Sequence, residues 1–116
     1  MLNVFISMRI KGLTYEQAVE NRDAIANAFI EEHEEYKDQI NIINSLFDDY
    51  TPGESNPIEF LGRSITAMKD ADVVLVPFDY FESKGCDCEY NVALQYGIPM
   101  KAYAVTKRCI IFIDII

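Results

Sequence analysis

Half of the 116 residues are hydrophobic, which is enough to form the core of one small domain over residues 1–116. The formal net charge of −9 argues against a binder of nucleic acid polymers, because such proteins need a basic face. The longest apolar runs are far too short to span a bilayer, and the first residues lack the basic start of a signal peptide. We therefore expect a cytoplasmic protein with no membrane partner.

Short apolar runs alternate with segments of helical pattern along the chain. The runs that predict strands are residues 2–6, 40–43, 72–77, 100–105 and 109–115. Thr14 and Gln17 have the spacing of a capping box, which starts a first helix. Asn56 before Pro57 starts a second helix, and Gly97 ends a third. The second helix is expected to bury the stripe Ile58, Leu61, Ile65 and Met68.

This alternation predicts an α/β fold, with a flavodoxin- or Rossmann-like doubly wound parallel sheet of about five strands and three main helices. The expected strand order is 2-1-3-4-5, which places a topological switch point between the first and third strands. Residues 7–13 and 78–89 would line the crevice at that point, where ligands bind in open α/β sheets.

Glu89 is the most informative residue of the chain. It follows the apolar strand at 72–77, and the pattern places it in the first turn of the third helix. The helix dipole would favour its ionised form there. An ionised carboxylate at the mouth of a crevice is suited to act as a nucleophile or to stabilise a cation. Acidic residues are also common in first helical turns for the dipole alone, so the position by itself leaves both interpretations open.

The first loop has the parts of a phosphate-binding site. Ser7, Arg9 and Gly12 lie between a strand and a helix N-terminus, where backbone N–H groups and a guanidinium favour an anion. The loop is not a P-loop, because the glycine-rich spacing and the Lys-Ser/Thr pair are missing. A plain connection between strand and helix would look the same.

Four aromatic residues lie in the loops near the expected crevice. Tyr80 and Phe81 precede Glu89, and Phe47 and Tyr50 follow the second strand. These rings would either stack on a base or cover the top of the core, and the sequence favours neither.

The three cysteines Cys86, Cys88 and Cys109 are expected to be free thiols, because their number is odd and no secretion signal is present. Cys86 and Cys88 have the spacing of half a metal site, but His33, the only histidine, lies in an acidic segment far from them. We therefore expect no metal, no cofactor and no thiol catalysis.

Four pieces of sequence then match a known pattern in order and spacing. They are the loop Ser7-Met8-Arg9 after the opening strand, Ala71-Asp72 before a Val-rich strand, Gly85 four residues before Glu89, and the ending Ala93-Leu94-Gln95-Tyr96-Gly97-Ile98-Pro99. Over about residues 1–105 the chain resembles the nucleoside 2-deoxyribosyltransferase-like superfamily, which includes the 2′-deoxynucleoside 5′-phosphate N-hydrolases. It is most similar to a small branch found in phage and bacterial genomes.

The resemblance implies that Glu89 attacks the anomeric carbon of a deoxyribosyl unit and releases the base, by retaining chemistry with an oxocarbenium-like transition state. At the position of Ser83 the transferases have an aspartate, whereas the monophosphate N-hydrolases have a serine that contacts the 5′-phosphate. Ser83 therefore tilts the expectation toward a nucleotide.

One position departs from the family. Ser64 stands where the family has an aspartate near the sugar and the leaving base, so Asp87 or Asp79 would have to handle the proton. The expected catalytic residues are Glu89 and Asp87, and the expected substrate-binding residues are Ser7, Met8, Arg9, Gly12, Ser64, Asp79, Ser83 and Gly85.

The expected function is cleavage, by hydrolysis or transfer, of the N-glycosidic bond of a deoxynucleoside or deoxynucleoside 5′-monophosphate. The alternatives are a nucleotide-binding module of the same fold without turnover, and a structural protein. The expected partners are a small nucleoside or nucleotide and further copies of the chain, in a homodimer or larger oligomer.

Overall fold

Five strands form one sheet in the computed structural model, which describes residues 1–51 and 53–115. The strands are β1 (Leu2–Ile6), β2 (Ile40–Ile42), β3 (Val73–Pro77), β4 (Met100–Val105) and β5 (Ile110–Asp114). Their order is β2-β1-β3-β4-β5, so the predicted flavodoxin-like order is confirmed.

The sheet is parallel except at one edge. The strands β2, β1, β3 and β4 run parallel, whereas β5 pairs antiparallel to β4. The connection between β4 and β5 is a tight turn at residues 106–109, in which the Thr106 N–H donates to the Cys109 carbonyl at 2.9 Å. A parallel pair needs a crossover of a dozen or more residues, so this short turn forces the last strand to reverse.

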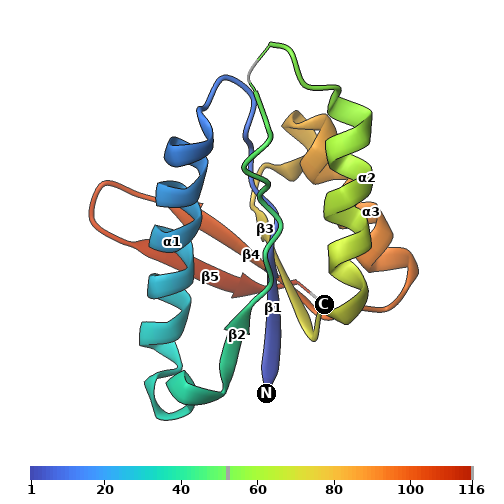
Figure 1. Cartoon of the computed structure of the whole chain (residues 1–116). Helices are drawn as coiled ribbons and strands as arrows, with labels where there is room; N and C mark the ends of the chain where they lie inside the picture. The colour runs from blue at the N-terminus through green and yellow to red at the C-terminus, as the bar shows by residue number, and fades with distance from the viewer. Residues whose placement is uncertain (52, 116) are drawn as a thin grey trace.

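Three helices cover the sheet (Figure 1): α1 (Tyr15–Glu32), α2 (Pro57–Ala67) and α3 (Lys84–Gln95). The capping box predicted at the start of α1 is present, because Thr14 Oγ1 accepts from the Gln17 N–H and Gln17 Oε1 accepts from the Thr14 N–H. The predicted cap of α2 is also present, with Asn56 Oδ1 accepting from two backbone N–H groups. Short 3₁₀ helices lie in the connections: η1 (Glu34–Gln39), η2 (Met68–Asp70) and η3 (Tyr80–Glu82).

Side-chain alternation along the central strands divides the core into two layers. One layer packs β1 and β3 against α1, through residues such as Val4, Leu75 and Phe29. The other packs the opposite strand faces against the α2–α3 side, through residues such as Phe5 and Val76. All five residues of β3 are buried, as expected for a central parallel strand.

One predicted core residue is exposed. Ile58 is 80% accessible, whereas Phe60 in the same turn of α2 is buried. Phe60 packs its ring against Phe47 and Tyr50 of the loop after β2, and two residues along a helix point to nearly opposite sides. The loop therefore determines which side of the first turn is covered, and the prediction that Ile58 is buried was wrong.

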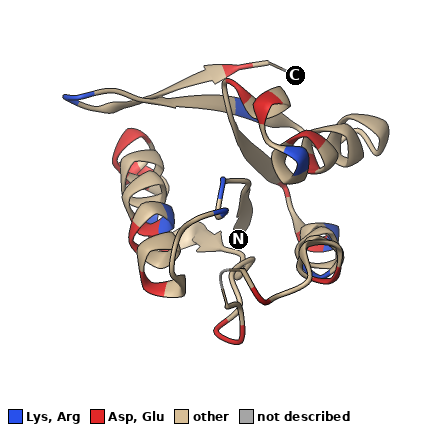
Figure 2. Ribbon diagram, turned by 90° about the horizontal axis from the view of Figure 1, so that it is seen from above, with Lys and Arg blue, Asp and Glu red and all other residues tan. Residues whose placement is uncertain are grey.

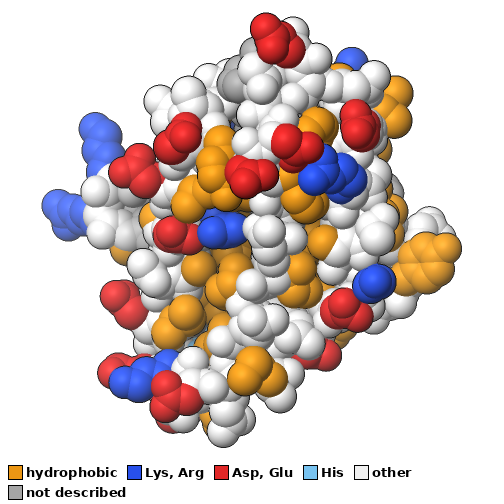
Figure 3. Space-filling model, in the orientation of Figure 1, with side chains coloured by type: hydrophobic (Ala, Val, Ile, Leu, Met, Phe, Trp, Pro, Cys, Tyr) orange, Lys and Arg blue, Asp and Glu red, His pale blue; other side chains and the backbone are white. Residues whose placement is uncertain are grey.

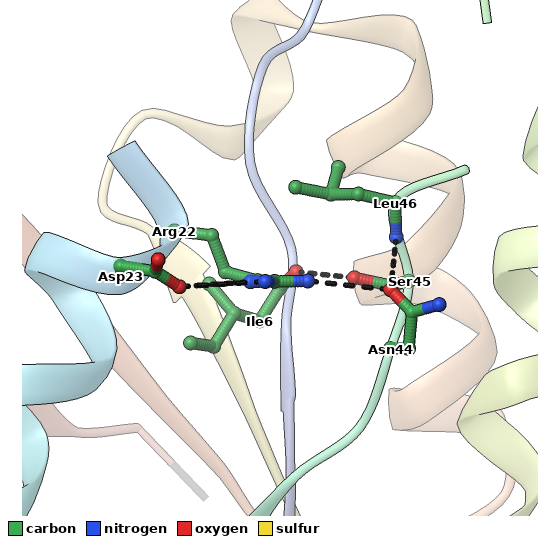
Figure 4. Close-up of polar contacts among 6 residues, drawn as sticks. All are labelled: Ile6, Arg22, Asp23, Asn44, Ser45 and Leu46. Carbon is green, nitrogen blue, oxygen red and sulfur yellow. Dashed lines mark hydrogen bonds and ion pairs between the residues drawn. The ribbon is translucent and has the colours of Figure 1, made fainter. Parts of the chain in front are cut away.

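The chain after β2 is attached to its neighbours by polar contacts (Figure 4). Arg22 of α1 donates to Asn44 Oδ1 at 3.3 Å, and Asn44 Oδ1 also accepts from the Leu46 N–H at 3.4 Å. Ser45 Oγ lies 3.5 Å from the Ile6 carbonyl. These contacts fix the second loop beside the carboxyl end of β1.

Charges of both signs are interspersed on the face shown in Figure 3, with no basic patch. In residues 1–51 and 53–115 there is no helix that is both long enough and apolar enough to cross a membrane.

Candidate active site

The helix that carries Glu89 starts earlier than the sequence suggested. Its N-cap is Ser83, whose hydroxyl accepts from the Cys86 N–H at 3.4 Å, and α3 begins at Lys84. Glu89 therefore lies in the second turn, and its predicted place in the first turn was wrong. Because the effect of the helix dipole falls off within the first turn, it contributes little to the ionisation of Glu89.

The carboxylate of Glu89 is buried between three elements. The residue is 6% exposed, and Ser7, at the end of β1, donates its hydroxyl to Oε1 at 2.7 Å. Ser64 of α2 donates its hydroxyl to Oε2. Both carboxylate oxygens are thus hydrogen-bonded, each by a neutral group from a segment distant in the sequence.

These surroundings disfavour a negative charge. Burial raises the pKa of Glu89, and the hydrogen bonds from Ser64 and Ser7 only partly oppose that shift. Among the described residues, no lysine or arginine forms a salt bridge with this carboxylate. A carboxyl group whose pKa is perturbed by desolvation at a switch point is a functional-site candidate.

Ser7 is itself fixed from two sides. Its N–H donates to the Leu75 carbonyl at 2.8 Å, and its own carbonyl accepts from the Tyr103 hydroxyl at 2.7 Å. Tyr103 lies on β4 and is buried, which raises the pKa of its phenol. The backbone of the residue that orients Glu89 is therefore attached to β3 and β4.

A cavity of about 390 Å³ lies on the α1 side of the same edge. Its lining comprises Met8, Arg9, Asn21, Ala24, Ile25, Pro77, Phe78, Asp79, Tyr103, Val105 and Ile110. Arg9 contacts the Asp79 carboxylate at 2.8 Å and the Asp79 carbonyl at 3.0 Å, and it lies 3.5 Å from Glu82. The hydrogen bond that Arg9 donates to Asp79 raises the pKa of Arg9, so the expected phosphate contact is already paired with carboxylates.

Six of the predicted site residues form two groups, one around the Glu89 carboxylate and one in the cavity. Ser7, Ser64 and Glu89 are in direct contact, and Met8, Arg9 and Asp79 line the cavity.

The remaining predicted site residues have other surroundings. Gly12 adopts a φ of +83° in an exposed turn. At Gly85, an added Cβ would lie 4.0 Å from Leu61 Cδ1, where α3 passes α2. The Asp87 carboxylate accepts from Asn91 of its own helix at 3.3 Å, and the residue lies about 200° around the helix from Glu89. Asp87 therefore belongs to neither group.

The aromatic residues mainly complete the packing. Tyr80 stacks on Tyr90, with ring centroids 3.8 Å apart, and covers the core layer next to α3, whereas Phe81 is exposed. Arg63 lies over the rings of Phe47 and Phe60, at 4.2 and 4.8 Å from their centroids. This cluster joins the second loop to α2, one residue before Ser64.

Two residues near Glu89 were missed by the sequence interpretation. Tyr103 lies between two alanines of β4, and a phenol at that place is a signal for a polar contact. Cys86, 1% exposed, lies one turn before Glu89, and burial raises the pKa of its thiol, which makes it unreactive. In the described part of the chain, no three His, Cys, Asp or Glu side chains are grouped to bind a metal.

No protein-family model, curated protein or solved structure matches the chain. The chemistry of the site is therefore the basis for inferring a function.

Proposed function

We propose that the protein cleaves the N-glycosidic bond of a deoxynucleoside or deoxynucleoside 5′-monophosphate, with Glu89 as the nucleophile. The observation that carries this proposal is a carboxylate buried at the carboxyl edge of the sheet and hydrogen-bonded, within residues 1–51 and 53–115, only by the hydroxyls of Ser7 and Ser64. Because no lysine or arginine in the described part of the chain forms a salt bridge with it, the carboxylate would interact strongly with the positive charge that develops on the sugar in the transition state.

The proposed reaction has two steps. A Glu89 oxygen bonds to the anomeric carbon while the bond to the base breaks, and the base leaves with the electron pair and acquires a proton. Water or a second base then bonds to the same carbon and releases Glu89. Each carboxylate oxygen has more than one lone pair, so Ser7 and Ser64 can keep their hydrogen bonds during the attack.

The cavity on the α1 side of the same edge is lined by the other groups of the proposed reaction, Arg9 and Asp79. Arg9 would exchange its pairing with Asp79 and Glu82 for the 5′-phosphate, which accepts charge-assisted hydrogen bonds. Asp79, which lines the cavity, is better placed than Asp87 to pass a proton to the leaving base. Both roles rest on the lining of this cavity, which also includes Tyr103, the hydrogen-bond partner of Ser7.

A second candidate function is nucleotide binding without turnover. It is favoured by Ser64, which contacts Glu89 where catalysis would use a carboxyl group to handle the proton. A hydroxyl can orient Glu89 but is a poor acid at neutral pH, so the pocket would retain its ligand and lose the chemical step.

Base release distinguishes the two functions. Each of the four deoxynucleosides and their 5′-monophosphates is incubated with the protein, and free base is measured by chromatography. We expect release that disappears in Glu89→Gln and persists in Glu20→Gln, which changes an exposed glutamate on α1. Release that survives Glu89→Gln refutes the proposed nucleophile. Calorimetric binding without any release identifies the binding module instead.

A further inference from the structure

The last strand of the sheet has an edge that is poorly protected against pairing. Residues Ile110 to Ile113 are all apolar, and the only charged residue of β5, Asp114, pairs with Lys101 of β4 at 2.6 Å. Edge strands of natural proteins are usually blunted by charges, prolines or bulges, because their backbone groups are a template for another strand. Residues 110–113 of β5 include no charge and no proline, so this part of the edge is suited to pairing.

The direction of the backbone groups on β5 follows from two hydrogen bonds. The Cys109 carbonyl accepts from the Thr106 N–H, and the Ile115 N–H donates to the Met100 carbonyl at 3.3 Å. Odd-numbered residues of β5 therefore direct their backbone groups toward β4. In an antiparallel ladder these groups alternate sides, so Ile110, Phe112 and Asp114 direct theirs toward the open edge.

The side chains of β5 divide between its two faces. Phe112 packs edge-on against Phe29 of α1, with ring centroids 5.7 Å apart. Ile111 and Ile113 point to the opposite face and are 48% and 61% exposed. Large exposed apolar side chains beside an open strand edge are typical of an interaction surface.

We propose that this edge pairs with β5 of a second copy of the chain, antiparallel, around a twofold axis at Ile111. In this register Ile110 of one copy hydrogen-bonds with Phe112 of the other, and both residues present outward backbone groups. The two Ile111 side chains face each other across the axis, and each Ile113 faces Cys109 of the other copy.

Charge complementarity favours a second copy as the occupant. The chain carries a net charge of −9, yet the turn between β4 and β5 consists of Lys107 and Arg108. The proposed register brings Arg108 of one copy level with Asp114 of the other, on the same face of the joined sheet. Figure 2 shows the basic tip of this hairpin extending clear of the helices, so two hairpins can lie side by side.

Oligomeric state tests the proposal independently of any catalytic activity. Sedimentation equilibrium of the full chain over a range of concentrations should show a dimer. Ile111→Lys places like charges opposite each other at the closest approach of the two strands, and we expect it to be monomeric. Ile58→Lys changes an isoleucine that is exposed on α2 and should remain dimeric. A monomeric wild-type chain, or a dimeric Ile111→Lys, overturns the proposal.

A crosslink tests the register. In a non-hydrogen-bonded antiparallel pair the Cα atoms lie about 4.5 Å apart, which allows a disulfide. The background variant is Cys88→Ser, Cys109→Ser. Adding Ile111→Cys and treating with oxidised glutathione should link two copies of the chain by a disulfide. The glutathione takes up the two electrons and two protons of the thiols. Ile58→Cys in the same background is the control and should stay uncrosslinked. A dimer that Ile111→Cys fails to link refutes the twofold axis at Ile111.

Discussion

Two carboxylates lie near the same edge of the sheet in opposite surroundings. Glu89 is buried and receives hydrogen bonds from two serine hydroxyls, and burial raises its pKa. Asp79 is partly exposed and forms a salt bridge with Arg9. The guanidinium neutralises the charge of Asp79, whereas the charge of Glu89 has no counterion within the described residues. The two carboxylates therefore differ in what surrounds their charge, a cation at Asp79 and neutral hydroxyls at Glu89.

The two environments also affect the stability of the fold differently. A partly exposed ion pair is screened by water and contributes little to folding. A buried carboxylate with neutral partners costs stability when it ionises, which proteins tolerate mainly at functional sites. The two carboxylates should therefore respond differently to mutation and to pH.

The largest effect is expected when Glu89 loses both hydroxyl partners. The double variant Ser7→Ala, Ser64→Ala leaves a buried carboxylate unsatisfied, and its free energy of unfolding at neutral pH should fall by about 3–5 kcal/mol. Urea unfolding measures this loss. The loss should shrink in acid, because a protonated carboxyl is cheaper to bury. An equal loss at pH 7 and pH 4 would mean that Glu89 is neutral throughout this range.

Removing the charge of Glu89 should change the free energy of unfolding by a smaller amount, and should raise it instead of lowering it. Glu89→Gln keeps the shape of the side chain, and we expect it to raise the free energy of unfolding at neutral pH by about 1 kcal/mol. The control Glu20→Gln should change it little. If Glu89→Gln is less stable than wild type at neutral pH, the carboxylate is stabilised by its surroundings and the comparison with Asp79 fails.

The pH dependence of this gain follows from the direction of the pKa shift. The pKa of Glu89 in the folded state is raised above its ordinary value of 4.5, so the folded protein binds the proton more tightly than the unfolded chain. The stability contributed by protonated Glu89 is present below that ordinary value and is lost as the pH rises through the folded pKa. The advantage of Glu89→Gln should therefore be absent below about pH 4.5 and grow above it.

Changing the exposed pair should barely affect folding. Arg9→Ala is expected to leave the unfolding midpoint almost unchanged, because the Arg9–Asp79 pair is partly exposed. It should weaken binding of a deoxynucleoside monophosphate about tenfold by calorimetry, the scale of one charge-assisted hydrogen bond, and leave the free nucleoside unaffected. If Arg9→Ala weakens binding of the monophosphate and of the free nucleoside equally, Arg9 does not bind the 5′-phosphate.

The smallest effect is expected at Asp87. Its carboxylate contacts Asn91 rather than the Glu89 site, so Asp87→Asn should change neither base release nor the free energy of unfolding appreciably. Asp79→Asn is the paired experiment and should slow base release. A larger loss of base release in Asp87→Asn than in Asp79→Asn would reverse the roles assigned to the two residues.

Most of the fold could be predicted from local sequence signals. The alternation of strands and helices gave the strand order, and the caps at Thr14 and Asn56 gave two helix starts. The reversal of β5 had an available signal, because the link after β4 is too short for a crossover.

The details of the site depended on contacts that sequence spacing does not encode. The proximity of Ser7 to Glu89 follows from the topology, since β1 and β3 are neighbours. Ser64 and Glu89 are 25 residues apart in the sequence, and their contact depends on how α2 packs against α3. The start of α3 was misplaced because Ser83 was interpreted as a ligand contact and not as a cap.

The hydrogen bond from Tyr103 to Ser7 also makes the site observable by absorbance. The chain has seven tyrosines and no tryptophan, so phenol ionisation dominates its near-ultraviolet titration. Burial raises the pKa of the Tyr103 phenol, whose hydroxyl donates to the Ser7 carbonyl. Ionisation of Tyr103 therefore reports the loss of its hydrogen bond to Ser7, a native optical signal that requires no label.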